Sequence, residues 1–215
     1  MAKQSNWQRY SASGTKALQS RDLDTAESMW LAAMEEATDF TDTDPRLAHT
    51  LESLAEVYYR RGNLDMASRY CQRVLDVCEK TLGPEHPDIG VLAHNLAMLH
   101  HMQCRFMEAE PLYKKAMTVR TKALGSKHPE VMRLLEGYAD LLEKMHRGEE
   151  ARHLKQCIDG MSTGRWTRSG RWTIFSSSGG APGAPVAADA AALSARAQAE
   201  PNADLSHSSN SAMAH

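Results

Sequence analysis

The sequence predicts an all-α protein in which helical hairpins repeat along the chain. Three prolines, Pro45, Pro87 and Pro129, follow one another at intervals of 42 residues. The stretch LGPEHPDIG at 82–90 returns as LGSKHPEVM at 124–132, and apolar residues recur at helical spacing between these stretches. Fixed periods of roughly 20 to 50 residues indicate stacked units, so we predict a superhelix of about four hairpins.

The two related stretches are interpreted as joints between helices. Gly83 and Gly125 can adopt the left-handed conformation that closes a helix, and a proline in the first turn begins the next helix without losing a needed N–H group. The residues that precede the prolines stand at cap positions: Asp44, His86 and His128. Asp44 is chemically the best cap of the three. We therefore predict a repeat domain over 1–160, with units near 6–43, 44–85, 86–127 and 128–160.

Each unit is predicted to hold two antiparallel helices joined by a short turn, such as RRGN at 60–63. The first helices of three units align on one small residue each: Ala55, Ala97 and Ala139. The second helices align in the same way on Ala67, Ala109 and Ala151. Small residues at these positions let paired helices approach closely, and such hairpins must stack to bury their apolar stripes.

An earlier, looser copy of the unit covers 6–37. Gly14 and Ala26 take its two small positions, and Tyr10 and Trp30 supply the bulk that packs between its helices.

Pro111 falls inside the second helix of the third unit. If that helix begins near Met107, Pro111 lies in the first turn, where backbone donors lack helical partners. We therefore expect the proline to leave this helix intact.

The best copy of the unit, HPDIGVLAHNLAMLHHMQCRFMEAEPLYKKAMTVRTKALGSKHPEV at 86–131, resembles the tetratricopeptide repeats of kinesin light chains and their bacterial relatives. It matches the His-Pro, Asn-Leu-Ala, Glu-Ala-Glu-Pro-Leu-Tyr and Leu-Gly elements of that family, and the resemblance extends over roughly 6–160. The usual turn glycine is kept as Gly62 and replaced by Cys104 and His146. The resemblance implies a non-enzymatic adaptor or scaffold that binds a peptide or protein in a concave groove lined by the first helices.

The register of the repeats gives the groove candidates. In the second unit they are His49, Glu52, Ser53, Glu56, Tyr59 and Arg60. In the third unit they are His94, Asn95, Met98, His101 and Met102. In the fourth unit they are Arg133, Glu136, Asp140, Glu143 and Lys144. In similar arrays an asparagine at the place of Asn95 bonds the backbone of a bound extended peptide, although these polar residues could equally form a solvated helix face.

Composition excludes several classes of function. A formal net charge of -2 gives no whole-chain attraction to nucleic acid or anionic lipid, and no window approaches the roughly 18 apolar residues of a membrane span. The start, MAKQSNWQRYSASG, has no apolar core of signal-peptide length, so we predict a cytoplasmic location. Four cysteines without a CxxC pair are interpreted as small buried hydrophobes: Cys71, Cys78, Cys104 and Cys157.

An enzymatic or metal-binding function has little support. His94 and His101 lie seven residues apart on one helix face, with His100 and Cys104 nearby, but the i, i+4 histidine pair of an HExxH site is absent. The chain also lacks a GxSxG elbow and a phosphate-binding loop. We predict no catalytic residue, no metal, no cofactor and no small-molecule substrate.

Composition changes abruptly after Gly160, and residues 161–215 are predicted to be a disordered tail because Ala, Ser, Gly and Pro dominate them. Only 186–199 has high helix propensity. The tetrapeptide Gly-Arg-Trp-Thr occurs twice within 164–173 and supplies Arg165, Trp166, Arg171 and Trp172.

This doubled motif could bind protein through aromatic anchors beside cations, or have no binding role. It could also tether the chain to a membrane or nucleic acid, which is our alternative function. The groove candidates lean acidic through Glu52, Glu56, Glu136, Asp140 and Glu143, so we also expect that the basic tail could enter the groove and mediate self-association.

Overall fold

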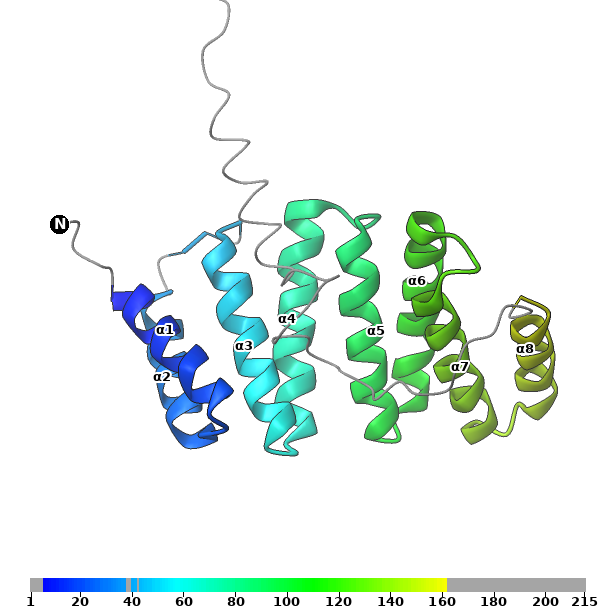
Figure 1. Cartoon of the computed structure of the whole chain (residues 1–215), viewed down its shortest axis with the longest axis horizontal. Helices are drawn as coiled ribbons and strands as arrows, with labels where there is room; N and C mark the ends of the chain where they lie inside the picture. The colour runs from blue at the N-terminus through cyan, green and yellow to red at the C-terminus, as the bar shows by residue number, and fades with distance from the viewer. Residues whose placement is uncertain (1–5, 38–39, 42, 162–215) are drawn as a thin grey trace, which may run out of the picture.

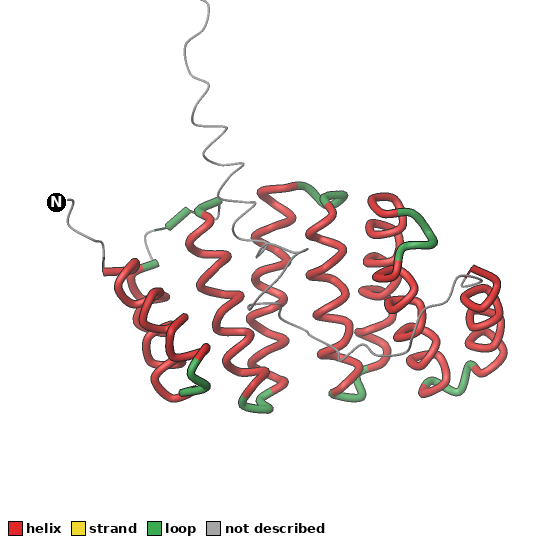
Figure 2. Tube along the Cα trace, viewed as in Figure 1, coloured by secondary structure: helices red, strands yellow, loops and turns green. Residues whose placement is uncertain are grey.

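The computed structural model describes residues 6–37, 40–41 and 43–161. This part of the chain contains eight α-helices and no strand, so the all-α prediction is confirmed. The helices lie side by side in one row, and each packs against the helices before and after it (Figures 1 and 2). They are α1 (Asn6–Gln19), α2 (Leu23–Glu36), α3 (Pro45–Arg60), α4 (Leu64–Leu82), α5 (Pro87–Met102), α6 (Phe106–Leu124), α7 (Pro129–Lys144) and α8 (Gly148–Met161).

The helices pair as four hairpins, α1–α2, α3–α4, α5–α6 and α7–α8, as predicted. Within the described residues, every helix is too short or too polar to span a membrane. The predicted tail, with Arg165, Trp166, Arg171, Trp172 and the segment 186–199, lies outside the described residues.

The predicted helix caps are confirmed at all three joints. Asp44 Oδ1 accepts a hydrogen bond of 2.9 Å from the backbone N–H two residues further on. The Nδ1 atoms of His86 and His128 accept equivalent bonds of 3.3 Å. Each cap is followed by a proline at the start of the next helix, so the 42-residue period marks the points where α3, α5 and α7 begin.

The glycines that close α4 and α6 are only partly as predicted. Gly83 and Gly125 have φ of 86° and 85°, which is the positive range that favours glycine. Their ψ values of 156° and 154° are extended, however, and this combination is essentially restricted to glycine. The chain therefore leaves the helix in an extended direction instead of curling through a left-handed turn.

All four turns within hairpins share one backbone geometry. One residue in each turn has positive φ: Arg21 (61°), Gly62 (76°), Cys104 (59°) and His146 (61°). The N–H of the next residue bonds the carbonyl five residues earlier, at 2.9 Å in every case. This is the hydrogen bond of a Schellman turn, and three of the four turns form it without glycine.

The alignment on small residues is confirmed by burial. Ala55, Ala97 and Ala139 on the first helices and Ala67, Ala109 and Ala151 on the second helices are all 0% exposed. In the first hairpin, a Cβ on Gly14 would lie 2.6 Å from Nε1 of Trp30, whose side chain is fully buried. The absence of a side chain at Gly14 is therefore what admits the tryptophan.

Two smaller expectations are wrong. α6 begins at Phe106, so Pro111 is its sixth residue and lies in the second turn, although the helix is unbroken as expected. The proline gives no N–H to the carbonyl of Met107, but both residues are exposed, so water can bond that carbonyl. Of the four free cysteines, Cys104 and Cys157 are exposed because they lie in a turn and on the outside of α8, and only Cys71 and Cys78 are buried.

Replacing Ala97 or Ala109 with leucine should overpack the contact between α5 and α6. We expect a loss of about 1–3 kcal/mol in the free energy of unfolding. The exposed Arg73→Ala variant on α4 should change it by less than about 0.5 kcal/mol. Urea denaturation of the three variants measures this, and similar stabilities for Ala97→Leu and Arg73→Ala would contradict the packing described.

The turns give a second prediction. Cys104→Gly and His146→Gly should each stabilise the chain by about 0.5–1 kcal/mol. A positive φ costs a non-glycine residue about 1–2 kcal/mol, and glycine avoids this cost but loses more conformational entropy on folding, which offsets part of the gain. Arg152→Gly, at an exposed position inside α8, should instead lose about 1 kcal/mol. Thermal unfolding compares the three, and a loss of stability in both turn variants would refute this account of the turns.

Candidate functional site

The first helices of the hairpins line one side of the row. In addition to neighbouring helices, α1 contacts α3 and α5 contacts α7. On α1, Trp7 Nε1 donates a hydrogen bond of 2.9 Å to Thr50 Oγ1 on α3. Helices two apart meet on the inner side of a curved row, so we call the residues that α3, α5 and α7 present there the inner surface.

The α3 candidates are largely engaged within the fold. Ser53 and Glu56 are 7% and 5% exposed, so they offer almost no surface, and Glu56 forms an ion pair with Arg60. Arg60 also donates to the backbone carbonyl of Leu18 at 2.9 Å. His49 and Tyr59 are half-buried, and the ring of His49 lies edge-on to two tryptophans. Burial lowers the pKa of His49, which favours its neutral form.

Glu52 differs from the other α3 residues. Its side chain is half-buried and makes no hydrogen bond or ion pair with the described part of the chain. Burial, with added repulsion from the carboxylates of Glu56 and Asp88, raises the pKa of Glu52 to about 7. Its charge also contributes to the raised thiol pKa values of Cys71 and Cys78 on α4, although burial is the main cause. The carboxyl of Glu52 is therefore within electrostatic range of residues on α4 and α5.

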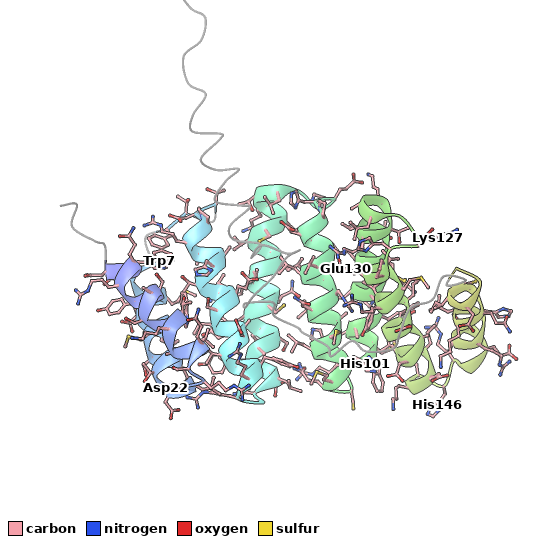
Figure 3. All side chains as sticks on the ribbon, in the orientation of Figure 1. Trp7, Asp22, His101, Lys127, Glu130 and His146 are labelled. Atoms are coloured by element: carbon pink, nitrogen blue, oxygen red, sulfur yellow. The ribbon has the colours of Figure 1, made fainter. Side chains whose placement is uncertain are left out.

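On α5, His101 links three helices. This residue is labelled in Figure 3. Its Nδ1 lies 3.4 Å from the hydroxyl of Tyr113 on α6, and its Nε2 lies 3.3 Å from Oδ2 of Asp140 on α7. Burial lowers the pKa of His101, and the charge of Asp140 opposes this effect. These contacts make His101 a packing residue of the inner surface.

His94 and Asn95 also lie on α5 and are half-buried. Burial, together with the positive charges of Arg120 and Arg133, lowers the pKa of His94 to about 4, so the ring is neutral at pH 7. Its Nε2 is buried without a hydrogen-bond partner among the described residues. The side chain of Asn95 likewise makes no hydrogen bond within the described ranges.

The rest of the α5 candidates are apolar, and the α7 candidates are charged. Met98 is half-buried, whereas Met102 is 49% exposed. All five α7 candidates are exposed: Arg133, Glu136, Asp140, Glu143 and Lys144. Two of their carboxylates have partners, since Asp140 contacts His101 and Glu143 accepts a bond of 2.7 Å from Lys155 on α8.

Sequence reasoning missed three residues that lie on this surface or contact its residues from below. Asp88 follows the His-Pro pair of α5, and the acid that recurs after both His-Pro pairs was the available signal. Tyr113 and Arg120 come from the second helix α6, which the register did not assign to the inner surface. They reach it because glycines make room: a Cβ on Gly90 would lie 2.7 Å from Cγ of Arg120, and one on Gly137 would lie 3.2 Å from the Tyr113 hydroxyl.

The histidines and the cysteine that resemble metal ligands in the sequence have other surroundings. His100 Nδ1 lies 3.1 Å from Glu108 Oε2, and Cys104 occupies the α5–α6 turn. Across the described ranges, no group of three or more His, Cys, Asp or Glu residues could hold a metal ion.

Glu52 makes the stability depend on pH in a defined direction. Because its folded pKa is about 7 and its ordinary value is 4.5, its contribution to stability is full below about pH 4.5 and is lost as the pH rises through 7. Glu52→Gln should therefore stabilise the chain at pH 8, on the order of 2 kcal/mol, and change little at pH 5. Denaturant unfolding at both pH values checks this, with the exposed Glu149→Gln as control. An equal Glu52→Gln effect at pH 5 and pH 8 would contradict the assigned environment.

Comparisons with known proteins agree with this architecture. A stretch of nephrocystin-3 from Xenopus laevis is 36% identical over 70 residues, which are 33% of this chain and 5% of that protein, so the match spans a small part of its length. A putative kinesin light chain from Podosopora anserina, with nearly identical TPR-like repeats, superposes with a TM-score of 0.64 at 21% identity, covering 77% of this chain and 80% of the other. BtubC (BKLC) from P. vanneervenii superposes with a TM-score of 0.61 at 18% identity, covering 94% of this chain and 85% of the other.

The family profile described as tetratricopeptide repeat matches residues 46–120 and 88–158. With four helical hairpins, a 42-residue period and this match, the chain belongs to the tetratricopeptide repeat family.

Proposed function

We propose that the chain is a non-enzymatic adaptor that binds an extended segment of a partner protein along its inner surface. Membership of a repeat family whose members act as protein-interaction scaffolds supports the general function. The observation that carries the finer proposal is Asn95, a half-buried side chain on α5 without a hydrogen bond among the described residues.

The chemistry of Asn95 fits an extended segment. Its amide carries both a donor and an acceptor, which together match the C=O and N–H groups of one residue in a strand-like backbone. Because the amide is partly shielded from water, such bonds compete with fewer water molecules than at an open surface. Contacts to the backbone would bind a segment without fixing its side chains.

Residues near Asn95 on α5 provide adaptable apolar contact. Met98 lies one turn beyond Asn95, and Met102 lies one turn further and is 49% exposed. Methionine side chains are flexible and polarisable, so they fit apolar groups of different shapes. These contacts support a protein or peptide ligand rather than a small-molecule substrate.

The same proposal assigns the chain to the cytoplasm and gives it no cofactor, membrane or nucleic-acid ligand. All four cysteines are free, which is typical of a reducing compartment. Among candidate occupants of the inner surface is the chain's own basic segment 164–173.

Asn95→Ala should weaken peptide binding on the order of tenfold, because losing two hydrogen bonds of about 0.5–1.5 kcal/mol each removes about 1–3 kcal/mol, a range that includes the 1.4 kcal/mol of a tenfold change. A displayed library of random peptides is first selected against the full chain, and Kd values of the selected peptides are measured by fluorescence anisotropy. Arg73→Ala, on the exposed side of α4, serves as control and should bind like the original chain. The proposal fails if the library yields no binder, or if binders lose nothing when Asn95 is replaced.

A further inference from the structure

The ring of His101 joins three helices from one point on α5. Its Nδ1 lies 3.4 Å from the hydroxyl of Tyr113 on α6, and its Nε2 lies 3.3 Å from Oδ2 of Asp140 on α7. The third hairpin, α5–α6, is thereby linked to the first helix of the fourth hairpin. Both contacts are polar, so they depend on which ring nitrogens carry a hydrogen.

The two partners determine which nitrogen of the neutral ring carries that hydrogen. An ionised carboxylate only accepts hydrogen bonds, so the contact with Asp140 requires a hydrogen on Nε2, because a bare nitrogen would repel the carboxylate oxygen. The Nδ1 atom is then an acceptor, and the hydroxyl of Tyr113 has to donate to it. The bonds therefore run in one direction, from Tyr113 through His101 to Asp140.

Protonation of His101 removes the acceptor from this chain of bonds. Both ring nitrogens then carry a hydrogen, so the ring can no longer accept from the hydroxyl of Tyr113. That hydroxyl is enclosed, since Tyr113 is 1% exposed and a Cβ on Gly137 would lie 3.2 Å from its oxygen. A buried O–H group that loses its partner costs free energy, and the neutral ring avoids this cost.

The titratable and charged groups around His101 come from α6 and α7. Burial lowers the pKa of His101, the charge of Asp140 opposes this effect, and the charge of Lys144 adds to it. The side chain of Asp140 is 55% exposed, so water screens its attraction for a charged ring. On α6, burial raises the pKa of Tyr113, so its hydroxyl keeps its hydrogen. The surroundings therefore favour the neutral ring.

We propose that His101 is an acid-sensitive lock between the third and fourth hairpins: the neutral ring holds α5, α6 and α7 together, and its protonation releases Tyr113. Because the folded pKa of His101 lies below the ordinary value of 6.5, the contribution of the lock to stability is full above about pH 6.5. It is lost as the pH falls through the folded pKa.

The lock lies beneath the surface on which a partner segment is proposed to bind. Its release should change the spacing of α5 and α7, so acid should weaken the binding of a peptide. This consequence for binding rests on the proposed function, whereas the lock itself does not.

The position of the hydrogen is tested first. The full-length chain is labelled with nitrogen-15 at its histidines and observed by NMR, and the His101→Gln variant identifies the ring signals of His101. At pH 8 we expect a hydrogen on Nε2 and none on Nδ1, and at pH 5 we expect protonation of Nδ1 as well. A hydrogen on Nδ1 at pH 8, or a ring that stays neutral at pH 5, would overturn the inference.

A double-mutant cycle then measures the lock. Urea unfolding compares the original chain with His101→Gln, Tyr113→Phe and the double variant, each at pH 8 and pH 5. Tyr113→Phe keeps the buried ring and removes only the hydroxyl. At pH 8 we expect the two positions to be coupled by roughly fivefold or more in the unfolding equilibrium constant. At pH 5 the coupling should be at least about threefold smaller, and the titration of all other groups cancels within the cycle.

The matched control is His153→Gln, which removes an exposed histidine from α8. It should change the unfolding equilibrium constant by less than about twofold at either pH, as expected for a surface position. If His101 and Tyr113 are not coupled at pH 8, or are coupled equally at both pH values, the lock is refuted.

Peptides selected from the library separate the lock from the proposed function. Between pH 8 and pH 5, their Kd should rise at least about threefold more for the original chain than for Tyr113→Phe, which lacks the lock at both pH values. Equal changes in the two chains would overturn the regulation of binding. If the library yields no binder, the proposed function fails, and the unfolding cycle still decides whether the lock exists.

Discussion

The close approach of paired helices at one small residue on each partner is the constraint on which the rest of this structure depends. Ala97 on α5 and Ala109 on α6 are both completely buried, and the corresponding alanines of the neighbouring hairpins are buried to the same extent. Interiors are packed densely enough that one larger side chain at such a point forces helices apart. Since every hairpin packs on the next, the spacing set inside one hairpin also fixes how its neighbours dock.

The same closeness lets second helices contribute to the inner surface. Arg120 and Tyr113 lie on α6, yet they reach toward the first helices where Gly90 and Gly137 leave room. Tyr113 then meets His101, and the charge of Arg120 helps to keep the His94 ring neutral. The inner surface is therefore a product of both helices of each hairpin, and its electrostatics follow from packing as much as from the exposed residues of α3, α5 and α7.

Several charged residues of the inner surface have partners within the fold. Arg60 pairs with Glu56, Asp140 contacts His101, and Glu143 accepts a bond from Lys155. Such pairs hold neighbouring helices in register and leave little free energy for recognition of a ligand. In the proposed function, recognition of the backbone falls to Asn95, whose half-buried amide has no partner in the described chain.

The sequence by itself determined the period, the caps and the helix faces, because each depends on residues close together in the chain. A proline after Asp44 or His86 starts a helix whatever lies beside it, and alanines one period apart occupy equivalent positions. The positive φ of Cys104 and His146 could not be predicted from these residues alone, because a non-glycine residue prefers negative φ. The Schellman turn of the hairpin overrides that preference.

Only the tertiary structure decided which inner residues remain available to a ligand. The repeat register assigned both Glu52 and Glu56 to the groove. Glu56 pairs with Arg60 one turn away, whereas the pKa of Glu52 is raised by burial and by the charges of Glu56 and of Asp88, which is 36 residues distant in the chain. Helical periodicity assigns a side chain to a face, and it carries no information on which charges of another helix will lie opposite. That choice depends on how closely α3, α4 and α5 pack, and so the environment of Glu52 became visible only in three dimensions.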